Sequence, residues 1–394
     1  MIDLTKPSFI EDPYPELAQL RKSPQPVWHE PTGMFLAACY KEANQVLRSR
    51  DLGRIFTPKQ PETQWEAFNW LHSDSILDSE PPKHSRLRSL VMKAFNPKKI
   101  EDLKPEIERI TNDLLDSASN TLKEKGEFDL IADFAEPLPV KVIAHLLGFP
   151  DKDEHLLRPW SQAIVKMYEV NPSQQDQDQA KQASEEFAAY VHELMLERKQ
   201  NPGTDLISDL ALVEEEGEKL NTQELIATCV LLLNAGHEAS VNGFGNGMVA
   251  TLKEPEQLAL LKADPYGIAE TAVDEFIRFD APLHLFERTA TKDTEIGGVE
   301  IKQGQKIAAL LGSANRDASI FENPDTLDLT RSPNPHIGFG AGIHFCIGAP
   351  LARLEMTVSL PALMTRFPNL ELAQEPIRRQ SFVLRGYEKV MVRN

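Results

Sequence analysis

Hydrophobic positions recur at helical spacing over much of the chain. Apolar residues return every three or four positions in four long segments, and many of the 28 prolines separate these segments from their neighbours. The predicted helices cover residues 101–119, 137–147, 178–199 and 222–252. The last contains about 31 residues and would be about 46 Å long, which is enough to cross a whole domain.

Two other segments alternate between hydrophobic and polar residues as β-strands do. Residues 27–40 alternate around a Pro-Thr-Gly turn at 31–33 and predict a hairpin. Residues 295–311 form a second β-like segment with turn glycines. No linker, low-complexity tract or internal repeat divides the chain. We therefore expect a single domain, residues 1–394, that is mostly α with a minor β portion.

The charge balance argues against a nucleic-acid partner. The chain has 42 Lys and Arg against 60 Asp and Glu, which gives a formal net charge of −18. Affinity for phosphate comes from basic residues that release counterions, and no local run of basic residues offsets the negative charge. Nucleic acid and anionic membrane surfaces are therefore excluded as expected partners.

The remaining composition predicts a soluble, cytoplasmic protein. Apolar runs such as Cys229–Leu233, which has five residues, are short, whereas a membrane span needs about 20. The first residues, MIDLTKPSFIEDPYPEL, lack the features of a secretory signal. The three cysteines, Cys39, Cys229 and Cys346, are too far apart in sequence for a disulfide framework or a paired zinc site.

The strongest chemical signal surrounds Cys346. From Phe339 to Pro350 the sequence is FGAGIHFCIGAP, and its glycine spacing does not fit a dinucleotide-binding motif. Glycines let a loop fold back so that backbone N–H groups point to one atom, and the following helix adds positive potential. Both effects lower the pKa of a thiol. We interpret this loop as a thiolate holder, and Cys39 and Cys229 as small buried side chains.

A lone thiolate without other soft ligands suits the axial position of a haem iron. The FxxGxHxCxG pattern of residues 339–348 resembles the haem-thiolate loop of the cytochrome P-450 family. The resemblance covers nearly the whole chain and is closest to the soluble bacterial members. It implies the cytochrome P-450 fold, with haem b (iron protoporphyrin IX) between the long oxygen-activating helix and the helix after the cysteine loop. Cys346 is then the metal ligand.

The resemblance also implies other haem contacts. Two propionates need cationic partners, and the residues at the matching positions are His84, Arg88, Arg288 and His344. The residues at positions that touch the porphyrin are Ala235, Ala239, Phe339 and Gly340.

Glu275 and Arg278 resemble the family's Glu-x-x-Arg pair, which supports the haem loop. A buried ion pair is costly to break, so we assign it a structural role. The family usually completes this pair with a later arginine, and Thr326 occupies the expected position here.

Residues 231–240 resemble the oxygen-activating helix of the family. Dioxygen must receive two protons before its O–O bond breaks, so an acid, a hydroxyl or ordered water is needed nearby. Glu238 matches the acidic relay residue, but the usual threonine is replaced by Ala239 and followed by Ser240. Ser240 with water, a substrate hydroxyl, or peroxide in place of dioxygen could compensate. A zinc-binding HExxH helix is excluded, because residue 241 is valine.

The function implied by the resemblance is that of a monooxygenase that inserts one oxygen atom from O2 into a hydrophobic small organic substrate, by hydroxylation or epoxidation. Electrons would come from NAD(P)H through a ferredoxin reductase and a ferredoxin, since the chain resembles no flavin or iron–sulfur domain. Ferredoxins are acidic, which predicts a basic docking patch. The candidates are Lys93, Lys98, Lys99 and Arg353, with ordinary solvated charges as the alternative.

Substrate contacts are expected from residues 52–77, which contain four aromatic side chains that could instead be core: Phe56, Trp65, Phe68 and Trp70. His284 and Glu287 are candidates to contact a substrate hydroxyl or amine. Two other functions stay open. A peroxide-driven peroxygenase would keep every haem residue, and a non-catalytic haem-binding sensor would not need Glu238.

Overall fold

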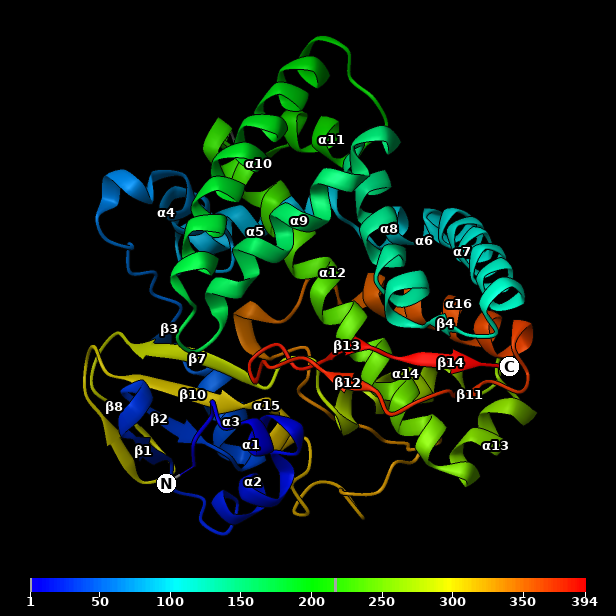
Figure 1. The fold of residues 1–394 in the computed structure, drawn as a ribbon. Helices are drawn as coiled ribbons and strands as arrows, with labels where there is room; N and C mark the ends of the chain where they lie inside the picture. Colours follow the sequence, from blue (N-terminus) through cyan, green and yellow to red (C-terminus); the bar gives the residue numbers. More distant parts are fainter. Residues whose placement is uncertain (1, 216–217) are drawn as a thin grey trace. The chain divides into compact units, whose positions relative to one another are not determined.

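The computed structural model describes residues 2–215 and 218–394 (Figure 1). The chain forms two compact units. Unit 1 consists of Met1–Gly53, Ile107–Leu138 and Ala239–Asn394, and unit 2 of Arg54–Glu106 and Pro139–Glu238. The long helix α12 (Thr222–Lys253) contributes to both, because the boundary falls between Glu238 and Ala239.

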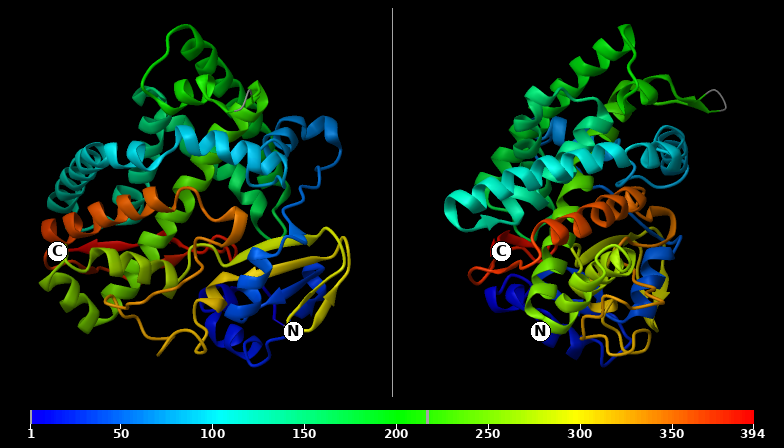
Figure 2. Two further views of the ribbon diagram at one scale, coloured as in Figure 1. Left: turned by 180° about the vertical axis from the view of Figure 1, so that it is seen from behind. Right: turned by 90° about the vertical axis from the view of Figure 1, so that its right-hand side faces the viewer.

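Unit 1 is built on a five-stranded sheet with the order β1-β2-β10-β7-β3. The strands β2 and β10 are parallel, and the other neighbours are antiparallel. In Figure 2 the blue N-terminal strands lie beside the yellow strands, as this pairing requires. The strands are β1 (Val27–His29), β2 (Met34–Ala37), β3 (Leu52–Gly53), β7 (Leu285–Ala290) and β10 (Lys306–Leu310). Helix α3 (Tyr40–Arg48) adds Val46 and Leu47 to the apolar core that includes Ile307.

Both predicted β segments are confirmed. Strands β1 and β2 are joined by η1 (Glu30–Thr32) and Gly33, whose φ is 62°. Strands β8 (Thr294–Ile296) and β9 (Val299–Ile301) turn at Gly297 and Gly298, whose φ values are 56° and 79°. Side chains rarely tolerate such angles, which explains the glycines. Strand β10 ends at Leu310, because the short helix α15 (Leu311–Ala314) begins at the next residue.

The other elements of unit 1 are helices and short sheets. The helices are α1 (Pro7–Glu11), α2 (Tyr14–Leu20), most of α7 (Lys104–Lys125), the π-helix η3 (Ile131–Ala135), α13 (Pro255–Ala263), α14 (Ala269–Phe279), η6 (Gly342–His344) and α16 (Ala349–Arg366). One sheet has the order β11-β14-β4, and another pairs β12 with β13. Their bounds are β4 (Phe128–Asp129), β11 (Glu371–Leu372), β12 (Ile377–Arg378), β13 (Tyr387–Lys389) and β14 (Met391–Arg393).

Unit 2 is mainly helical. Its elements are η2 (Glu62–Gln64), α4 (Glu66–Ser73), α5 (Lys83–Ala94), α6 (Pro97–Asp102), most of α8 (Pro137–Leu147), η4 (Asp151–Asp153), α9 (Glu154–Val165), η5 (Lys166–Tyr168), α10 (Gln174–Gln200), α11 (Leu206–Leu212) and the pair β5 (Glu214–Glu215) and β6 (Glu218–Lys219).

All four predicted helices are present, with differences only at their ends. Helix α8 spans the predicted residues, and α12 extends the prediction by one residue. Helix α10 begins four residues early, because Ser173 and Asp176 form a capping box there. Helix α7 begins three residues late, since α6 occupies the chain up to Asp102. The mostly α architecture with a minor β portion is therefore confirmed.

Three glycines of α12 are explained by close packing. A Cβ atom on Gly247 would lie 1.9 Å from Cγ of Phe276. On Gly243 and Gly245 it would lie 2.8 and 2.7 Å from the ends of isoleucine side chains. Neighbouring side chains approach this helix so closely that an added Cβ would require them to move.

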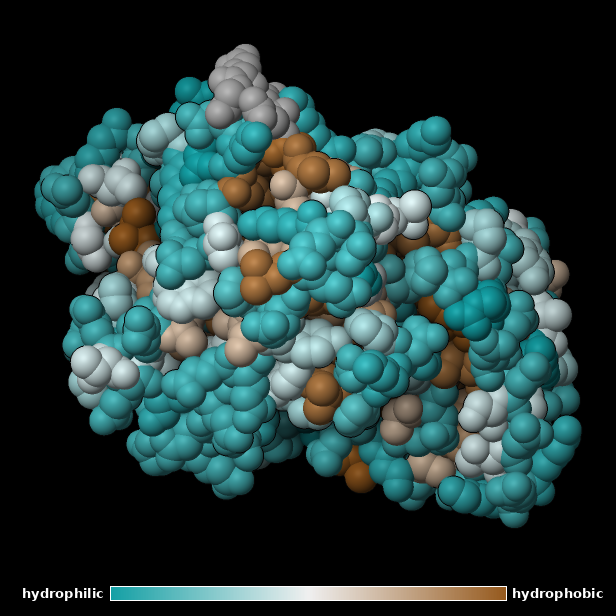
Figure 3. Space-filling model, turned by 90° about the horizontal axis from the view of Figure 1, so that it is seen from above, coloured by the Kyte–Doolittle hydropathy of each residue, from teal (hydrophilic) through white to brown (hydrophobic). Residues whose placement is uncertain are grey.

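None of the helices in residues 2–215 and 218–394 has both the length and the apolar character needed to cross a bilayer. The face drawn in Figure 3 is mostly hydrophilic, and its hydrophobic side chains form separate small groups.

We predict that Gly247→Ala destabilises the protein although alanine favours helix. The new methyl group would overlap the rigid Phe276 ring and cost about 3 kcal/mol, against a gain of about 1 kcal/mol in helix propensity. The midpoint of urea unfolding should fall. Gly243→Ala and Gly245→Ala are matched controls, because they meet flexible side-chain ends in the same helix. Equal midpoints for the three variants would contradict the packing argument.

Candidate functional site

The loop before α16 has the folded-back form that its glycines predict. Gly340 and Gly342 have φ values of 73° and 72°, and a Cβ on Gly342 would lie 2.5 Å from the carbonyl oxygen of Leu47. The backbone N–H of Cys346 donates to the carbonyl of Phe339 at 3.0 Å, so the loop closes on itself. Cys346 then stands just before the N-terminus of α16.

Burial separates Cys346 from the other two cysteines. Burial raises the pKa of Cys39 to about 11 and raises the pKa of Cys229 further. Both are therefore thiols near neutrality. Cys346 is exposed and outside any disulfide. Cys39 is the N-cap residue of α3, but burial keeps it a thiol, whereas Cys346 is exposed just before α16.

The predicted propionate residues lie in both units. In unit 1, Arg288 is a buried residue of β7, and its guanidinium lies 4.4 Å from the centroid of the Phe286 ring and donates to the Glu287 carbonyl at 3.0 Å. His344 ends η6. In unit 2, His84 and Arg88 lie four residues apart on α5, and His84 is buried.

Residues 231–240, the predicted oxygen-activating segment, lie in α12. Ala235 and Glu238 belong to its unit 2 part, and Ala239 and Ser240 to its unit 1 part. Gly236 allows close packing of α12 against α8, because a Cβ there would lie 2.1 Å from Cδ1 of Ile143.

A buried histidine lies beside Glu238, and it was missed as a candidate from sequence. Nδ1 of His237 is 3.2 Å from the hydroxyl of Ser161 on α9, and its Nε2 is 3.5 Å from Oε1 of Glu238. All three residues are buried. From sequence, His237 served only to reject a zinc helix, and nothing local indicates that α9 would place a hydroxyl against it.

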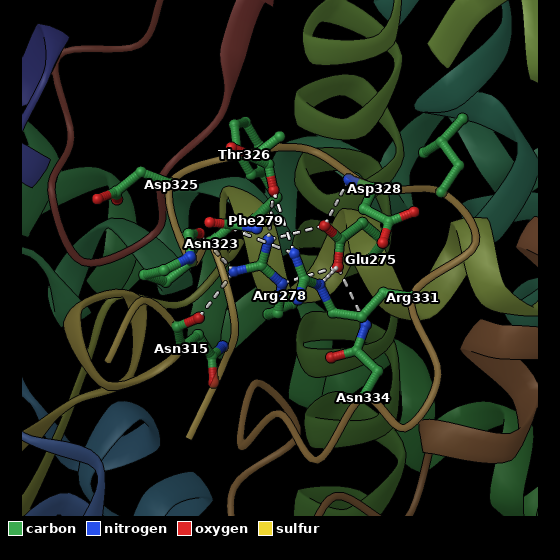
Figure 4. Close-up of polar contacts among 12 residues, drawn as sticks. Glu275, Arg278, Phe279, Asn315, Asn323, Asp325, Thr326, Asp328, Arg331 and Asn334 are labelled. Carbon is green, nitrogen blue, oxygen red and sulfur yellow. Dashed lines mark hydrogen bonds and ion pairs between the residues drawn. The ribbon is translucent and has the colours of Figure 1, made fainter. Parts of the chain in front are cut away.

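The Glu275–Arg278 pair is fully buried in unit 1, and Figure 4 shows its surroundings. Nε and Nη2 of Arg278 donate to the two carboxylate oxygens of Glu275, each at 2.7 Å. The other guanidinium donors reach backbone carbonyls of Asn315, Pro324 and Thr326 at 2.7 to 3.1 Å. The arginine is therefore surrounded by acceptors from a long irregular segment.

Arg331, and not the residue at position 326, completes the pair. Its Nε donates to Oε2 of Glu275 at 3.1 Å, and Asn334 donates to the same oxygen at 3.1 Å. Thr326 contributes only its carbonyl, to Arg278 and Arg331. The sequence left the completing residue open, and the structure finds it five residues after position 326, where the irregular segment returns toward α14.

His284 packs inside unit 1 beside Tyr14 and Asp280. It is fully buried, with Nε2 3.4 Å from the hydroxyl of Tyr14 and 3.8 Å from Oδ1 of Asp280. Burial lowers its pKa to about 4, so the ring is neutral near neutral pH. Glu287 is paired with Lys306 at 3.2 Å. The two residues therefore have partners inside unit 1, and their contact with a substrate stays a prediction.

The aromatic side chains of unit 2 pack on one another. Trp65 and Phe68 are buried with ring centroids 5.2 Å apart, and Phe68 stacks on His72 at 4.0 Å. Phe56 stacks on the same histidine at 5.4 Å. This favours core packing over substrate recognition for these aromatic residues.

Two of the four candidate docking cations already have carboxylate partners. Lys99 forms an ion pair with Asp209. Arg353 donates from Nε to Asp274 at 2.8 Å. Lys93 and Lys98 are exposed. The basic docking patch stays a prediction.

Glu355 is a buried carboxyl group on α16. Burial raises its pKa to about 8, and its Oε1 has no hydrogen-bond partner among residues 2–215 and 218–394. The carboxyl is therefore mainly protonated near neutral pH.

The donors present fit a haem with a thiolate ligand. Within residues 2–215 and 218–394, no group of three or more His, Cys, Asp or Glu side chains could hold a metal ion. An iron centre at Cys346 must therefore bring most of its own ligands, as a porphyrin does. The buried cation Arg288 and the exposed thiol Cys346 suit an anionic cofactor with one protein ligand.

The comparisons with known proteins agree over nearly the whole chain. The family described as Cytochrome P450 matches residues 10–264 and 267–389. The chain is 37% identical over 362 residues to the putative cytochrome P450 YjiB of Bacillus subtilis, covering 91% of this chain and 88% of that protein. It is 37% identical over 406 residues to 6-deoxyerythronolide B hydroxylase of Saccharopolyspora erythraea, covering 99% and 98%.

A solved structure has the same fold. The crystal structure of P450BioI in complex with an acyl carrier protein ligated to hexadec-9Z-enoic acid superposes with a TM-score of 0.91. The two chains are 34% identical, and 98% of each is covered.

We predict that Glu355 makes the protein less stable as pH rises. Its folded pKa of about 8 lies above the ordinary value of 4.5. Its contribution is fully present below the ordinary value and is lost as pH rises through about 8. Between these values the unfolding free energy should fall by about 1.4 kcal/mol per pH unit. Urea unfolding of Glu355→Gln should lack this component, whereas Glu270→Gln, at an exposed position of α14, should keep it. Identical pH profiles for all three proteins would contradict the assignment.

Proposed function

The chain belongs to the cytochrome P450 family and is a haem-dependent monooxygenase, and we propose that it inserts one oxygen atom from O2 into a hydrophobic small organic substrate by hydroxylation or epoxidation. We propose that residues 1–394 act as one P450 domain in this reaction. The observation that carries the proposal is the exposed thiol of Cys346 on a folded-back glycine loop at the start of α16.

When bound, haem b supplies the iron that activates dioxygen. Cys346 is the proposed iron ligand through Sγ. The side chains proposed to hold the propionates are those of His84, Arg88, Arg288 and His344. Those proposed to touch the porphyrin are Ala235, Ala239, Phe339 and Gly340. The burial of His84 and Arg288 supports a role toward an anionic group.

Glu238 and Ser240 are the proposed proton donors of α12. Glu238 is buried beside His237, and Ser161 holds the other side of that imidazole ring. This arrangement supports Glu238 as a carboxyl whose position is set by its neighbours. Ala239 has no hydroxyl, so the nearest hydroxyl along the helix is that of Ser240.

Electrons are proposed to reach the protein from NAD(P)H through a ferredoxin reductase and a ferredoxin. A ferredoxin is acidic, and Lys93 and Lys98 are exposed cations that support docking of such a partner. A local group of such lysines would attract the partner although the chain as a whole carries a formal charge of −18.

The proposed substrate is a hydrophobic natural product or its precursor. One relative is named as a hydroxylase of 6-deoxyerythronolide B, and one solved neighbour holds an acyl carrier protein with a fatty acid. A carrier-bound substrate is therefore worth testing beside free compounds. The replacement of threonine by Ala239 favours one second candidate, a peroxide-driven peroxygenase, because peroxide brings its own protons.

We predict that the ferrous protein with carbon monoxide shows the strongly red-shifted Soret band of thiolate ligation. Cys346→Ser should lose this band, whereas Cys39→Ser should keep it. Absence of the band in the wild type would overturn the proposed ligand.

We predict that product oxygen comes from O2. Turnover with isotopically labelled dioxygen, NADH, a ferredoxin and its reductase should place the label in the product. The substrates should include free and carrier-bound compounds that shift the ferric spin state. Label from peroxide alone, with no turnover from dioxygen, would establish the peroxygenase instead.

We predict that Ser240→Ala lowers the fraction of NADH that is coupled to product, because a proton-delivering hydroxyl is lost. The matched control is Ser184→Ala, which removes a buried hydroxyl bonded to the Ala180 carbonyl at 2.7 Å in α10. Equal coupling in Ser240→Ala and the wild type across several substrates would exclude Ser240 from proton delivery.

A further inference from the structure

One carboxylate of α14 holds two side chains that both contact Phe339. Oδ1 of Asp274 accepts from Nε of Arg353 at 2.8 Å and lies 3.3 Å from Nε2 of His336. The Arg353 guanidinium lies 4.5 Å from the centroid of the Phe339 ring, and the His336 ring centroid is 5.7 Å from it. The three residues come from α14, α16 and the loop before Phe339.

The contacts of His336 assign the position of its proton. The backbone N–H of Gly338 donates to Nδ1 of His336 at 3.2 Å, so Nδ1 is an acceptor. A neutral imidazole has one donor and one acceptor, so the proton is on Nε2 and points to Asp274. The ring therefore links the α14 carboxylate to the backbone of the loop that leads to Phe339.

Phe339 connects this cluster to the cysteine. Its carbonyl accepts the backbone N–H of Cys346 at 3.0 Å. Gly338, just before it, packs against α14 so closely that a Cβ would lie 2.4 Å from Cγ2 of Ile277. Movement of Phe339 would therefore change the position of Cys346 directly, and the backbone on the other side has no room to absorb it.

We infer that Asp274 is a positioning residue for the thiolate of Cys346, acting through Arg353, His336 and Phe339. This inference rests on the proposed function, since it assumes that Cys346 is the iron ligand. Burial acts to raise the pKa of Asp274, but hydrogen bonds from His336 and Arg353 outweigh it and hold the pKa below its usual value. The carboxylate is therefore charged at neutral pH, and its bond to Arg353 is charge-assisted.

The test measures the thiolate and not turnover. In the holoenzyme, Asp274→Asn should lose the red-shifted ferrous–carbon monoxide band about tenfold faster than the wild type in mild denaturant, because one charge-assisted bond is weakened. The reduction potential of the iron should also shift. Asp274→Glu should restore part of both properties. Glu270→Gln is the matched control, because it removes an exposed carboxylate from the same helix and should behave as the wild type.

Each outcome decides the matter. A wild type without the red-shifted band would overturn the proposed function itself. A wild-type band with unchanged decay and potential in Asp274→Asn would overturn only the inference about Asp274. If that variant does not fold, Arg353→Gln and His336→Gln decide, because each removes one half of the cluster and leaves the carboxylate in place. The inference would also be overturned if Arg353→Gln and His336→Gln both kept the band decay rate and the iron reduction potential of the wild type.

Arg353 is also a candidate for the docking patch. A charge reversal at Arg353 would disturb both Phe339 and any partner. Reversal of Lys93 and Lys98 alone therefore tests docking without touching the cluster.

Discussion

The buried ion pair of Glu275 and Arg278 organises the segment that leads to the cysteine loop. Two opposite charges with no exposed surface are stable only when nearly every donor and acceptor is satisfied. Here the partners are the backbone of residues 315–328 and the side chains of Arg331 and Asn334. An irregular stretch of chain thus takes the place of water around the pair, and its path is set by that requirement.

Three acidic residues in and just after α14 anchor three different parts of unit 1. Asp274 contacts the cysteine loop and α16, and Glu275 contacts the irregular segment. Asp280, just after the helix, binds Arg378, Arg385 and the hydroxyl of Tyr14. Burial acts to raise the pKa of Asp280, but the two arginines hold it well below its usual value. The helix therefore ties the N-terminal and C-terminal segments to the loop that carries Cys346.

Helix α12 contains two adjacent buried polar residues, His237 and Glu238. Its glycines allow close neighbours, while His237 and Glu238 are buried polar side chains next to Ala239, where the family usually has threonine. The loss of one hydroxyl is thus accompanied by a buried imidazole that Ser161 orients. Buried polar groups need such partners, because an unsatisfied one costs free energy comparable to a lost hydrogen bond. The same partners restrict how Glu238 can move.

Short-range sequence patterns predicted the long helices, the β segments and the cysteine loop of this protein. Hydrophobic periodicity placed the four long helices, turn glycines placed both β segments, and the spacing of glycine, histidine and cysteine in residues 339–348 identified the thiolate loop. These signals are short-range, because a helix face, a positive φ and a loop glycine each depend on neighbouring residues. The pairs that were not predicted join distant residues. Arg331 and Glu275 are 56 positions apart, and Ser161 and His237 are 76 apart. Asp274 is at least 62 positions from its partners His336 and Arg353. Only tertiary structure decides such pairs, because many charged and polar residues could fill each role and the path of the chain selects among them.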